Sequence, residues 1–306
     1  MRARGAEKTL LVVAAIAAVI DDAGKRRADL CLRSRAGPSP ASTVIRLWDA
    51  QMSRSKRVLR DRADLKTGEI HVWNAPLPGR CRTDELSKLL EPEEQARAAA
   101  FAFDLDRFRY IHSHSVLRQI LSRYIDRDPS ELAFDRTPHQ KPHLVPKFGD
   151  PHLHFSLTHS NRCCLIAVRV GCPVGVDVEE LRELPEAASI ARRWFSQAES
   201  DALARLSGSA LLTGFFALWT HREAAIKALG ASLEVGLGEL ECALDPDGTV
   251  RLVSWRGDES IRRRWSVRRL NLARGYLGAL ATLSHFDSLR CLTWDSDAPS
   301  EATFSG

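Results

Sequence analysis

The sequence lacks the features that mark several common classes of protein. None of its seven cysteines forms a Cys-x-x-Cys pair, and the adjacent Cys163 and Cys164 are poorly placed to share one tetrahedral metal ion. The apolar run at residues 10–20 has 11 residues and is too short to span a bilayer. With 44% hydrophobic residues, the chain can still bury a sizeable core. We therefore expect a globular, cytoplasmic protein with reduced thiols and no membrane segment.

The net positive charge of the chain lies in its N-terminal stretch. Residues 1–70 hold 15 Lys and Arg against 8 Asp and Glu, whereas the remainder holds 29 against 31. A later group of arginines, at 262–264 and 268–269, is interrupted by apolar residues in the manner of a solvated strand. Because the basic charge lies outside the region with clear structural patterns, we expect no nucleic-acid partner.

Residues 1–68 are predicted to form a basic N-terminal extension that is disordered or dispensable. The apolar run at 10–20 resembles the centre of a signal peptide, but two aspartates follow it where a cleavage site would be expected. Met52 is the only other methionine, and strand and helix patterns begin shortly after it. Residues 1–51 are therefore interpreted as a dispensable or wrongly assigned extension.

The remaining chain alternates between strand and helix patterns and predicts an α+β fold. A strand at 69–73 precedes short helices and a long amphipathic helix at 107–124, and strands at 163–170 and 174–179 are interpreted as a hairpin. Further helices are predicted at 185–194, 197–205 and 211–229, and strands at 239–244, 249–255, 265–272 and 276–283. This order suggests two similar halves, 69–173 and 174–285, each a small antiparallel sheet packed with helices, before a C-terminal tail at 286–306.

Two acids share one face of the strand predicted at residues 174–179. Valine occupies every second position, so the other face carries Gly175, Asp177 and Glu179. Carboxylates about 7 Å apart on alternate strand positions repel each other unless the face is solvated or a cation lies between them. Oxygen ligands without a nearby His or Cys favour magnesium over zinc. An exposed strand face with ordinary acids is the alternative interpretation.

A second motif lies on the helix predicted at 211–229. Trp219, Glu223 and Lys227 follow at intervals of four and share one stripe of this helix. A Glu–Lys pair at this spacing is common on helix surfaces, where it contributes about 0.3 kcal/mol. The other positions are mostly apolar, however, and leave little exposed face. A carboxylate and an ammonium group are therefore predicted to line a cleft.

A third cluster, upstream of the other two, suits a phosphate group. Lys141 lies in a polar loop, and Thr158 and His159 lie at the end of a short strand. Lysine, hydroxyl, imidazole and the backbone amides of a turn are suitable phosphate partners. The nearby histidines at 139, 143, 152 and 154 alternate along the chain or lie in proline-broken loops, which argues against zinc.

Taken in order, these segments resemble the 4′-phosphopantetheinyl transferases of the type that activates surfactin synthetase. The matching motifs are Phe-Ser-Leu-Thr-His-Ser at 155–160, Gly-Val-Asp-Val-Glu at 175–179 and Trp-Thr-His-Arg-Glu-Ala-Ala-Ile-Lys at 219–227, and the resemblance extends over residues 70–285. It implies an enzyme that transfers the 4′-phosphopantetheine group of coenzyme A to a serine of an apo acyl or peptidyl carrier protein. Adenosine 3′,5′-bisphosphate is released.

The resemblance also implies roles for individual residues. Asp177, Glu179 and Glu223 would surround a magnesium ion, Glu223 being the candidate base, and Lys227 would contact the pyrophosphate of coenzyme A. Lys141, Thr158 and His159 would hold its 3′-phosphate, and Arg97 and Arg109 are similar to basic residues that bind the nucleotide end. The active site would lie in the cleft between the two halves.

Four positions depart from the family pattern. Ser156 stands where asparagine is common and Thr158 where serine is common, and threonine retains a hydroxyl donor. Arg222 stands where the third motif usually has lysine; it retains a cation, but its planar fork would hold a phosphate or carboxylate differently. Glu94 lies near a position where some relatives carry lysine, which removes one expected contact with coenzyme A.

A non-catalytic module that binds coenzyme A or a carrier protein is the alternative function, and the intact acids and Lys227 argue against it. The sequence does not distinguish carriers of fatty acid, polyketide or peptide synthesis. A monomer is expected, because two halves of one chain suffice to form the cleft.

Overall fold

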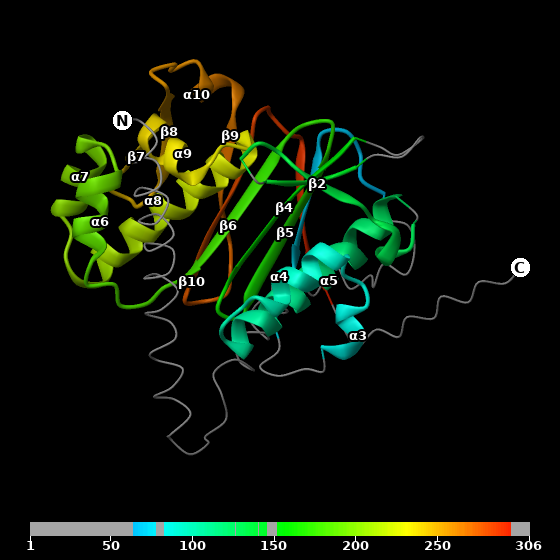
Figure 1. Cartoon of the computed structure of the whole chain (residues 1–306). Coiled ribbons are helices and arrows are strands. Elements are labelled where there is room, and N and C mark those ends of the chain that lie inside the picture. The colour runs from blue at the N-terminus through cyan, green and yellow to red at the C-terminus, as the bar shows by residue number, and fades with distance from the viewer. Residues whose placement is uncertain (1–63, 78–82, 126, 140, 146–151, 295–306) are drawn as a thin grey trace, which may run out of the picture.

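The computed structural model describes residues 64–77, 83–125, 127–139, 141–145 and 152–294 of the chain (Figure 1). The interpretation of residues 1–51 therefore lies outside the described residues. The first part of the described chain contains these elements in order: β1 (Glu69–Asn74), α3 (Asp84–Ser87), α4 (Pro92–Ala99), α5 (Asp104–Ile125), the 3₁₀ helix η1 (Pro129–Glu131), β2 (Phe134–Arg136), β3 (Pro142–Leu144), β4 (Leu153–Ser160) and β5 (Cys163–Val170).

The second part begins at β6; α6 to α8 and β7 to β10 lie close to the predicted ranges, whereas the short helices α9 and α10 were not predicted. Its elements in order are β6 (Val174–Glu180), α6 (Ala187–Trp194), α7 (Gln197–Ala204), α8 (Gly208–Leu229), α9 (Leu233–Glu239), β7 (Leu240–Leu244), β8 (Val250–Trp255), α10 (Ile261–Arg264), β9 (Ser266–Leu270), β10 (Tyr276–Thr282) and β11 (Ser288–Thr293). β11 lies in the range that the sequence analysis assigns to a tail.

Several small sheets form the centre of the molecule. One has the strand order β11-β1-β5-β4 and another the order β6-β10-β9, and the pairs β2-β3 and β7-β8 form two-stranded sheets. Every ladder between these strands is antiparallel except that of β1 with β11, which is parallel. The predicted mixture of helices with small, mainly antiparallel sheets is confirmed.

Side-chain alternation along the strands sets the order of the layers. Ile166 and Val168 of β5 pack with α5, whereas Leu165 and Ala167, at the alternate positions, pack with the valines of β6. On the other face of the three-stranded sheet, Ala279 and Ala281 of β10 pack with α8. The layers therefore follow the order α5, four-stranded sheet, three-stranded sheet, α8 (Figure 1). β6 places its valines between the sheets and turns its acids towards α8.

The predicted hairpin of residues 163–170 with 174–179 is wrong. β5 pairs with β4 on one side and with β1 on the other, so it has no free edge for β6. β4 and β5 are the real hairpin, and Asn161 at its tip has a φ of 50°. Gly171, with a φ of 74°, begins the turn that carries the chain to the other sheet, where β6 pairs with β10.

Helix α8 lies unusually close to β6 at Gly175. A Cβ atom on Gly175 would lie 2.0 Å from the carbonyl oxygen of Ala224 and 2.5 Å from the amide nitrogen of Ala228. The two backbones are in contact there, and only glycine leaves room for this approach. α8 ends at Gly230, which has the left-handed φ of 66° and caps the helix as predicted.

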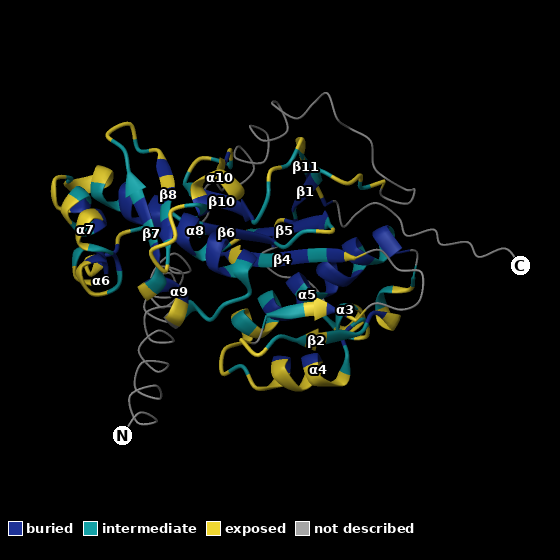
Figure 2. Cartoon of the chain, turned by 90° about the horizontal axis from the view of Figure 1, so that it is seen from above, coloured by how far each residue is buried: buried dark blue, intermediate teal, exposed yellow. Residues whose placement is uncertain are grey.

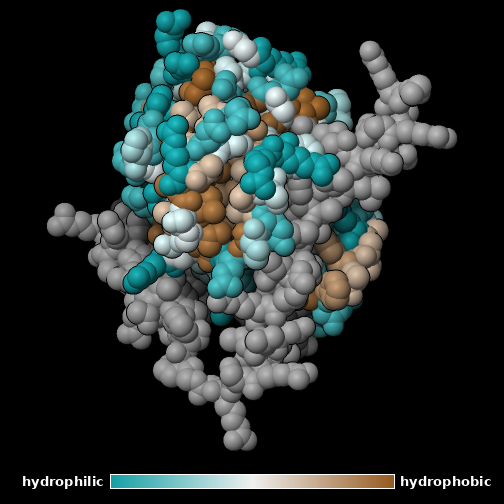
Figure 3. All heavy atoms as spheres, turned by 90° about the vertical axis from the view of Figure 1, so that its left-hand side faces the viewer, coloured by the Kyte–Doolittle hydropathy of each residue, from teal (hydrophilic) through white to brown (hydrophobic). Residues whose placement is uncertain are grey.

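Burial follows this layered arrangement. In Figure 2 the central strands and α8 are mainly buried, and exposed residues gather on the outward sides of α4, α6 and α7. On the face that carries α6 and α7, apolar residues gather near the centre (Figure 3). Partly buried hydrophobic residues extend the core of this part outwards, among them Leu206, Leu211, Leu212 and Leu244.

Two expectations about the whole chain can be compared with its described part. None of the helices there is both long and apolar enough to cross a bilayer. The five cysteines in the same part are free thiols, and burial raises the pKa of Cys242 to about 12. The Cys242 thiol is therefore protonated at neutral pH and packs as a small apolar group.

Candidate active site

Three hydroxyl groups of β4 join the two large sheets. Because Ser156, Thr158 and Ser160 alternate along the strand, all three side chains face β6. The Ser156 hydroxyl accepts from the amide of Val176 at 3.1 Å, and the Thr158 hydroxyl donates to Asp177 at 2.9 Å. The Ser160 hydroxyl donates to Glu179 at 2.8 Å. Side chains, rather than a backbone ladder, thus hold the acids of β6 against β4.

Lys227 lies among the acids that the sequence analysis singled out. Its ammonium group is 2.5 Å from the Oδ1 atom of Asp177 and 3.3 Å from the Oε2 atom of Glu223. The Thr158 hydroxyl lies 3.3 Å from the same ammonium group. Asp177 is 3% exposed, so these acids do not form an exposed strand face. The structure brings the strand motif and the helix motif together.

Burial and mutual repulsion raise the pKa values of two acids in this cluster. Burial raises the pKa of Glu223 to about 8, and repulsion from Asp177 adds to the effect. Burial likewise raises the pKa of Glu179 to about 7, again with repulsion from Asp177. Although burial opposes it, the charges of Asp177 and Glu223 keep the pKa of Lys227 above its usual value. Asp177 and Glu223 thus share the charge of the Lys227 ammonium group, whereas Glu179 pairs with Arg182 at 3.3 Å.

The Oδ2 atom of Asp177 is the clearest sign of an incomplete site. It is buried and accepts no hydrogen bond from the described residues. A buried carboxylate oxygen without a partner is unfavourable, so it marks a place where a cation or donor would bind. With the side chains as they stand, no three His, Cys, Asp or Glu residues of the described ranges form a ready-made metal site.

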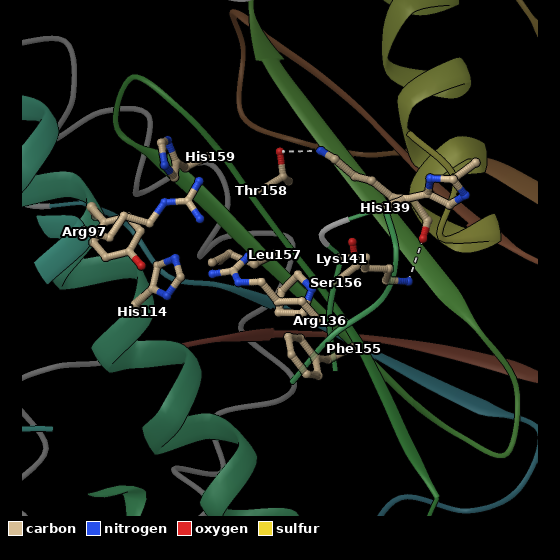
Figure 4. Close-up of a pocket in the computed structure, with 14 residues that line it drawn as sticks. Arg97, His114, Arg136, His139, Lys141, Phe155, Ser156, Leu157, Thr158 and His159 are labelled. Carbon is tan, nitrogen blue, oxygen red and sulfur yellow. Dashed lines mark hydrogen bonds between the residues drawn. The ribbon is translucent and has the colours of Figure 1, made fainter. Parts of the chain in front are cut away.

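A pocket extends from this cluster into the first part of the chain (Figure 4). Thr158 and Lys227 line one end, and residues of α4, α5, β4 and the β2–β3 region line most of the rest. Its basic and aromatic lining includes Arg97, Tyr110, His114, Arg136, His139, Lys141 and His159. The three acids are not among the lining residues, so the pocket meets the acid cluster through Thr158 and Lys227, and the rest of its lining is rich in guanidinium and imidazole groups.

Lys141 lines the pocket, but its ammonium group already has acceptors. It donates to the carbonyl oxygen of Val174 at 3.1 Å. It also donates to the carbonyl oxygen of Lys227 at 2.6 Å, the bond that is dashed at Lys141 in Figure 4. Burial lowers the pKa of Lys141 to about 8, and the charge of Lys227 contributes. The side chain thereby ties the first part of the chain to the start of β6 and the end of α8.

The two predicted arginines lie apart. Arg97 of α4 lines the pocket, whereas Arg109 of α5 is not among its lining residues. Arg109 donates to the side-chain oxygen of Asn161 at 3.2 Å, and Asn161 donates to Glu180 at 2.9 Å. Arg109 thus connects α5, through the tip of the β4–β5 hairpin, to the end of β6.

Arg222, at the position where the motif usually has lysine, contributes to the core. It is fully buried and holds both carboxylate oxygens of Glu199, at 2.6 and 2.7 Å. It also donates to the carbonyl oxygen of Leu237, and Glu199 accepts from the amide of Cys242 at 3.1 Å. The carboxylate that Arg222 holds therefore belongs to α7, and the pair fastens α7, α8, α9 and β7 together.

We expect Arg222→Lys to destabilise the protein by about 2 kcal/mol, because lysine loses the bidentate contact while the Glu199 carboxylate stays buried. Urea denaturation followed by tryptophan fluorescence measures the difference. Arg251→Lys is the matched control, since Arg251 pairs with Asp245 on the surface and its side chain is 55% exposed. An unchanged denaturation midpoint for Arg222→Lys would contradict the structural role.

Several residues of the site escaped the sequence analysis. Arg182 follows β6 and donates to Glu179 at 3.3 Å, and Arg136 and Tyr110 line the pocket. Ser160, which donates to Glu179, could have been predicted from the sequence, because it is the last residue of the motif at 155–160. Trp219 shares the predicted stripe but is 1% exposed and packs on Phe215, with ring centroids 6.1 Å apart, in the core.

Comparison with known proteins finds matches along both parts of the chain. The family model described as 4′-phosphopantetheinyl transferase superfamily matches residues 173–301, and that described as 4′-phosphopantetheinyl transferase, N-terminal, matches residues 73–171. The 4′-phosphopantetheinyl transferase HetI of Nostoc is 34% identical over 189 residues, which are 61% of this chain and 79% of HetI. The 4′-phosphopantetheinyl transferase Sfp of Bacillus subtilis is 27% identical over 169 residues, 55% of this chain and 73% of Sfp.

The pocket with its acid cluster and the matches along both parts of the chain define a transferase. The chain belongs to the 4′-phosphopantetheinyl transferase family, as the resemblance of its three motifs predicted. The alternative of a non-catalytic module finds no support among these relatives.

Proposed function

We propose that the protein transfers the 4′-phosphopantetheine group of coenzyme A to a serine hydroxyl of an apo acyl or peptidyl carrier protein. The observation that carries this proposal is the Lys227 ammonium group, held between Asp177 and Glu223 at the end of a basic pocket. Such an arrangement suits a substrate that carries a pyrophosphate and a further phosphate, as coenzyme A does.

The acid cluster fits a magnesium ion by its chemistry. The potential ligands are all carboxylate oxygens, from Asp177, Glu179 and Glu223. The buried Oδ2 atom of Asp177 accepts no hydrogen bond from the described residues. These three residues would hold the ion. When bound, it would neutralise the pyrophosphate and the excess negative charge of the cluster.

The remaining steps fall to side chains of the chain itself. Lys227 would turn from the carboxylates to the pyrophosphate and stabilise the charge that develops on the leaving oxygen. Glu223 is the candidate base that removes the proton of the carrier serine, directly or through a water molecule. The serine oxygen then bonds to the β-phosphorus, the bond to the bridging oxygen breaks, and adenosine 3′,5′-bisphosphate leaves.

Arg97, Lys141, Thr158 and His159 would bind the nucleotide end, since all four line the pocket. For Lys141 this requires that its ammonium group contact a phosphate while it holds the two backbone carbonyls. Arg109 does not line the pocket, so it would affect nucleotide binding only indirectly. Its contact is with Asn161 at the tip of the β4–β5 hairpin. The assignment of Arg109 to the nucleotide is therefore the least direct of the set.

We also propose that residues 69–173 and 174–285 form two similar halves with the active site between them. In support, α5 covers the four-stranded sheet as α8 covers the three-stranded one. The pocket is lined from both halves, with Lys227 and Ala231 contributed by the second. One chain supplies the whole described lining, which favours a monomer. We further propose that the protein acts in the cytoplasm without nucleic acid or membrane.

Mass spectrometry of apo carrier proteins after incubation with the protein, coenzyme A and magnesium tests the proposal. We expect a gain of one phosphopantetheine group on the carrier and none on a carrier whose modified serine is replaced by alanine. A panel of carriers from fatty acid, polyketide and peptide synthesis would also define the partner. Binding of coenzyme A without any mass gain across the panel would favour the non-catalytic alternative.

A further inference from the structure

Each acid of β6 that faces α8 is held by only one of its two carboxylate oxygens. For Asp177, the Thr158 hydroxyl donates to Oδ1 at 2.9 Å, and the Lys227 ammonium group lies 2.5 Å from the same atom. The Oδ2 atom is buried and accepts no hydrogen bond from the described residues. The carboxylate of Asp177 thus has one occupied and one open oxygen.

Glu179 repeats this pattern two positions further along β6. The Ser160 hydroxyl donates to its Oε2 atom at 2.8 Å, and Arg182 donates to the same atom at 3.3 Å. Both of these donors leave the Oε1 atom without a hydrogen bond from the described part of the chain. Residues two apart on a strand share a face, so the two hydroxyls of β4 meet the two acids of β6 in the same order. Each acid is therefore held by one hydroxyl group and one cation.

The Ser160 hydroxyl is itself fixed on both sides. Besides donating to Glu179, it accepts from the backbone amide of Glu180 at 3.1 Å. A hydroxyl group has a single proton, and the amide leaves that proton to the carboxylate. Ser160 is 9% exposed, so water has little access to this contact. Ser160 therefore ties the side chain of Glu179 to the backbone that carries it.

Arg182 is also fixed, in contrast to Lys227. The guanidinium nitrogen that contacts Glu179 also donates to the carbonyl oxygen of Glu180 at 3.2 Å, and the guanidinium group lies 5.5 Å from the centre of the Phe216 ring. The Arg182 side chain is 8% exposed, whereas that of Lys227 is 29% exposed. Lys227 can therefore turn to a substrate while Arg182 stays with Glu179.

We propose that Ser160 and Arg182 are positioning residues that hold Glu179 by its Oε2 atom and so leave Oε1 for the metal ion. The inference rests on the metal site of the proposed function, in which Asp177, Glu179 and Glu223 would hold magnesium. A glutamate side chain loses considerable rotamer freedom when it binds an ion, and a partner that already orients it reduces this loss. Hydrogen-bond partners of metal ligands accordingly contribute about 10-fold to 100-fold to metal affinity.

Manganese binding to the full chain tests the proposal without a transfer step. Manganese(II) replaces magnesium as the probe, and electron paramagnetic resonance measures the free ion at saturating coenzyme A without a carrier protein. We expect Ser160→Ala to weaken manganese binding about tenfold, and Ser160→Thr, which keeps the hydroxyl group, to stay within about twofold of the wild type. The same face of β4 already carries a threonine at 158, where its hydroxyl group holds Asp177.

Ser156→Ala is the matched control. The Ser156 hydroxyl accepts from the backbone amide of Val176 at 3.1 Å, so it joins β4 to β6 without holding a carboxylate. Both alanine substitutions remove a contact between the two strands, but only the one at 160 releases an acid. We expect Ser156→Ala to bind manganese within about twofold of the wild type. Equal weakening by the two alanine variants would assign Ser160 to the packing of the sheets and overturn its positioning role.

Arg182→Lys tests the second positioning residue at constant charge. Lysine keeps the positive charge near the acids but lacks the guanidinium group that reaches both Glu179 and the Glu180 carbonyl. We expect manganese binding to weaken about fivefold. In carrier labelling, Ser160→Ala and Arg182→Lys should raise the magnesium concentration that gives the half-maximal rate, and leave the maximal rate within about threefold. An unchanged manganese affinity of Arg182→Lys would overturn the role of Arg182.

The remaining outcomes separate this inference from the proposed function. Carrier labelling by the wild type together with an unchanged or higher manganese affinity of Ser160→Ala would overturn the inference alone. Expected manganese affinities in every variant, without labelling of any carrier protein by the wild type, would overturn the proposed function alone. A wild type that neither binds manganese nor labels a carrier would overturn both.

Discussion

Asp177→Ala lowers the rate of phosphopantetheine transfer by an expected factor of about 10³ or more. The side chain lies 3% exposed between Thr158 and Lys227, and its second oxygen has no partner within the described residues. Its removal deletes a proposed magnesium ligand and leaves Lys227 without its closest counter-charge. Carrier labelling, followed by mass spectrometry at saturating coenzyme A and magnesium, measures the rate.

The loss should not come from unfolding, and two variants examine this. Asp177→Asn keeps the shape of the side chain and should be nearly as inactive, since an amide oxygen replaces the charged ligand. Asp201→Ala removes an exposed aspartate of α7 that only accepts from Gln197, and should label carriers at the wild-type rate. Near-normal labelling by Asp177→Ala would refute the assignment of the acid cluster.

Gly175→Ala should destabilise the protein by about 3 kcal/mol or more. The added methyl group would lie 2.0 Å from the carbonyl oxygen of Ala224, and backbone atoms of a buried helix cannot turn aside as a flexible side chain can. α8 would have to move away from β6, and Glu223 and Lys227 would move with it. Activity and stability should therefore fall together.

Chemical denaturation and carrier labelling of Gly175→Ala measure the two effects. Gly238→Ala is the matched control, because a Cβ atom there meets nothing within 4 Å and the residue lies in helix α9. We expect it to be neutral or slightly stabilising, as alanine favours helices over glycine. A Gly175→Ala protein as stable as the control would show that α8 and β6 are farther apart than described.

The chemistry of the site was predictable because it depends on short-range periodicity. Two acids two positions apart share a strand face, and Glu223 and Lys227 share a helix stripe whatever surrounds them. The sequence also indicated that this helix is mostly buried, which distinguished a cleft from a surface ion pair. The two motifs come together because α8 approaches β6 closely at Gly175. The spacing of residues in the sequence does not indicate this approach.

Long-range pairing was beyond the sequence. The hairpin prediction for β5 and β6 failed because it assumed that consecutive strands pair, whereas β5 takes β1 and β4 as its neighbours. Tyr110 and Arg136 reach the same pocket from α5 and β2, and no spacing relates them. Arg222 occupies a motif position that usually holds lysine. Its partner Glu199 could be identified only from the packing of α7 against α8.

The pairing of β1 with β11 bears on the order in which the molecule can be assembled. Glu69–Asn74 lies in register with Ser288–Thr293, and Leu292 and Trp294 complete the core beneath α5. The first half is therefore discontinuous along the chain, because its last strand is made after the entire second half. During synthesis, β1 leaves the ribosome long before its partner. A fragment that stops before β11 would present β1 as an open sheet edge, available to other unfinished chains.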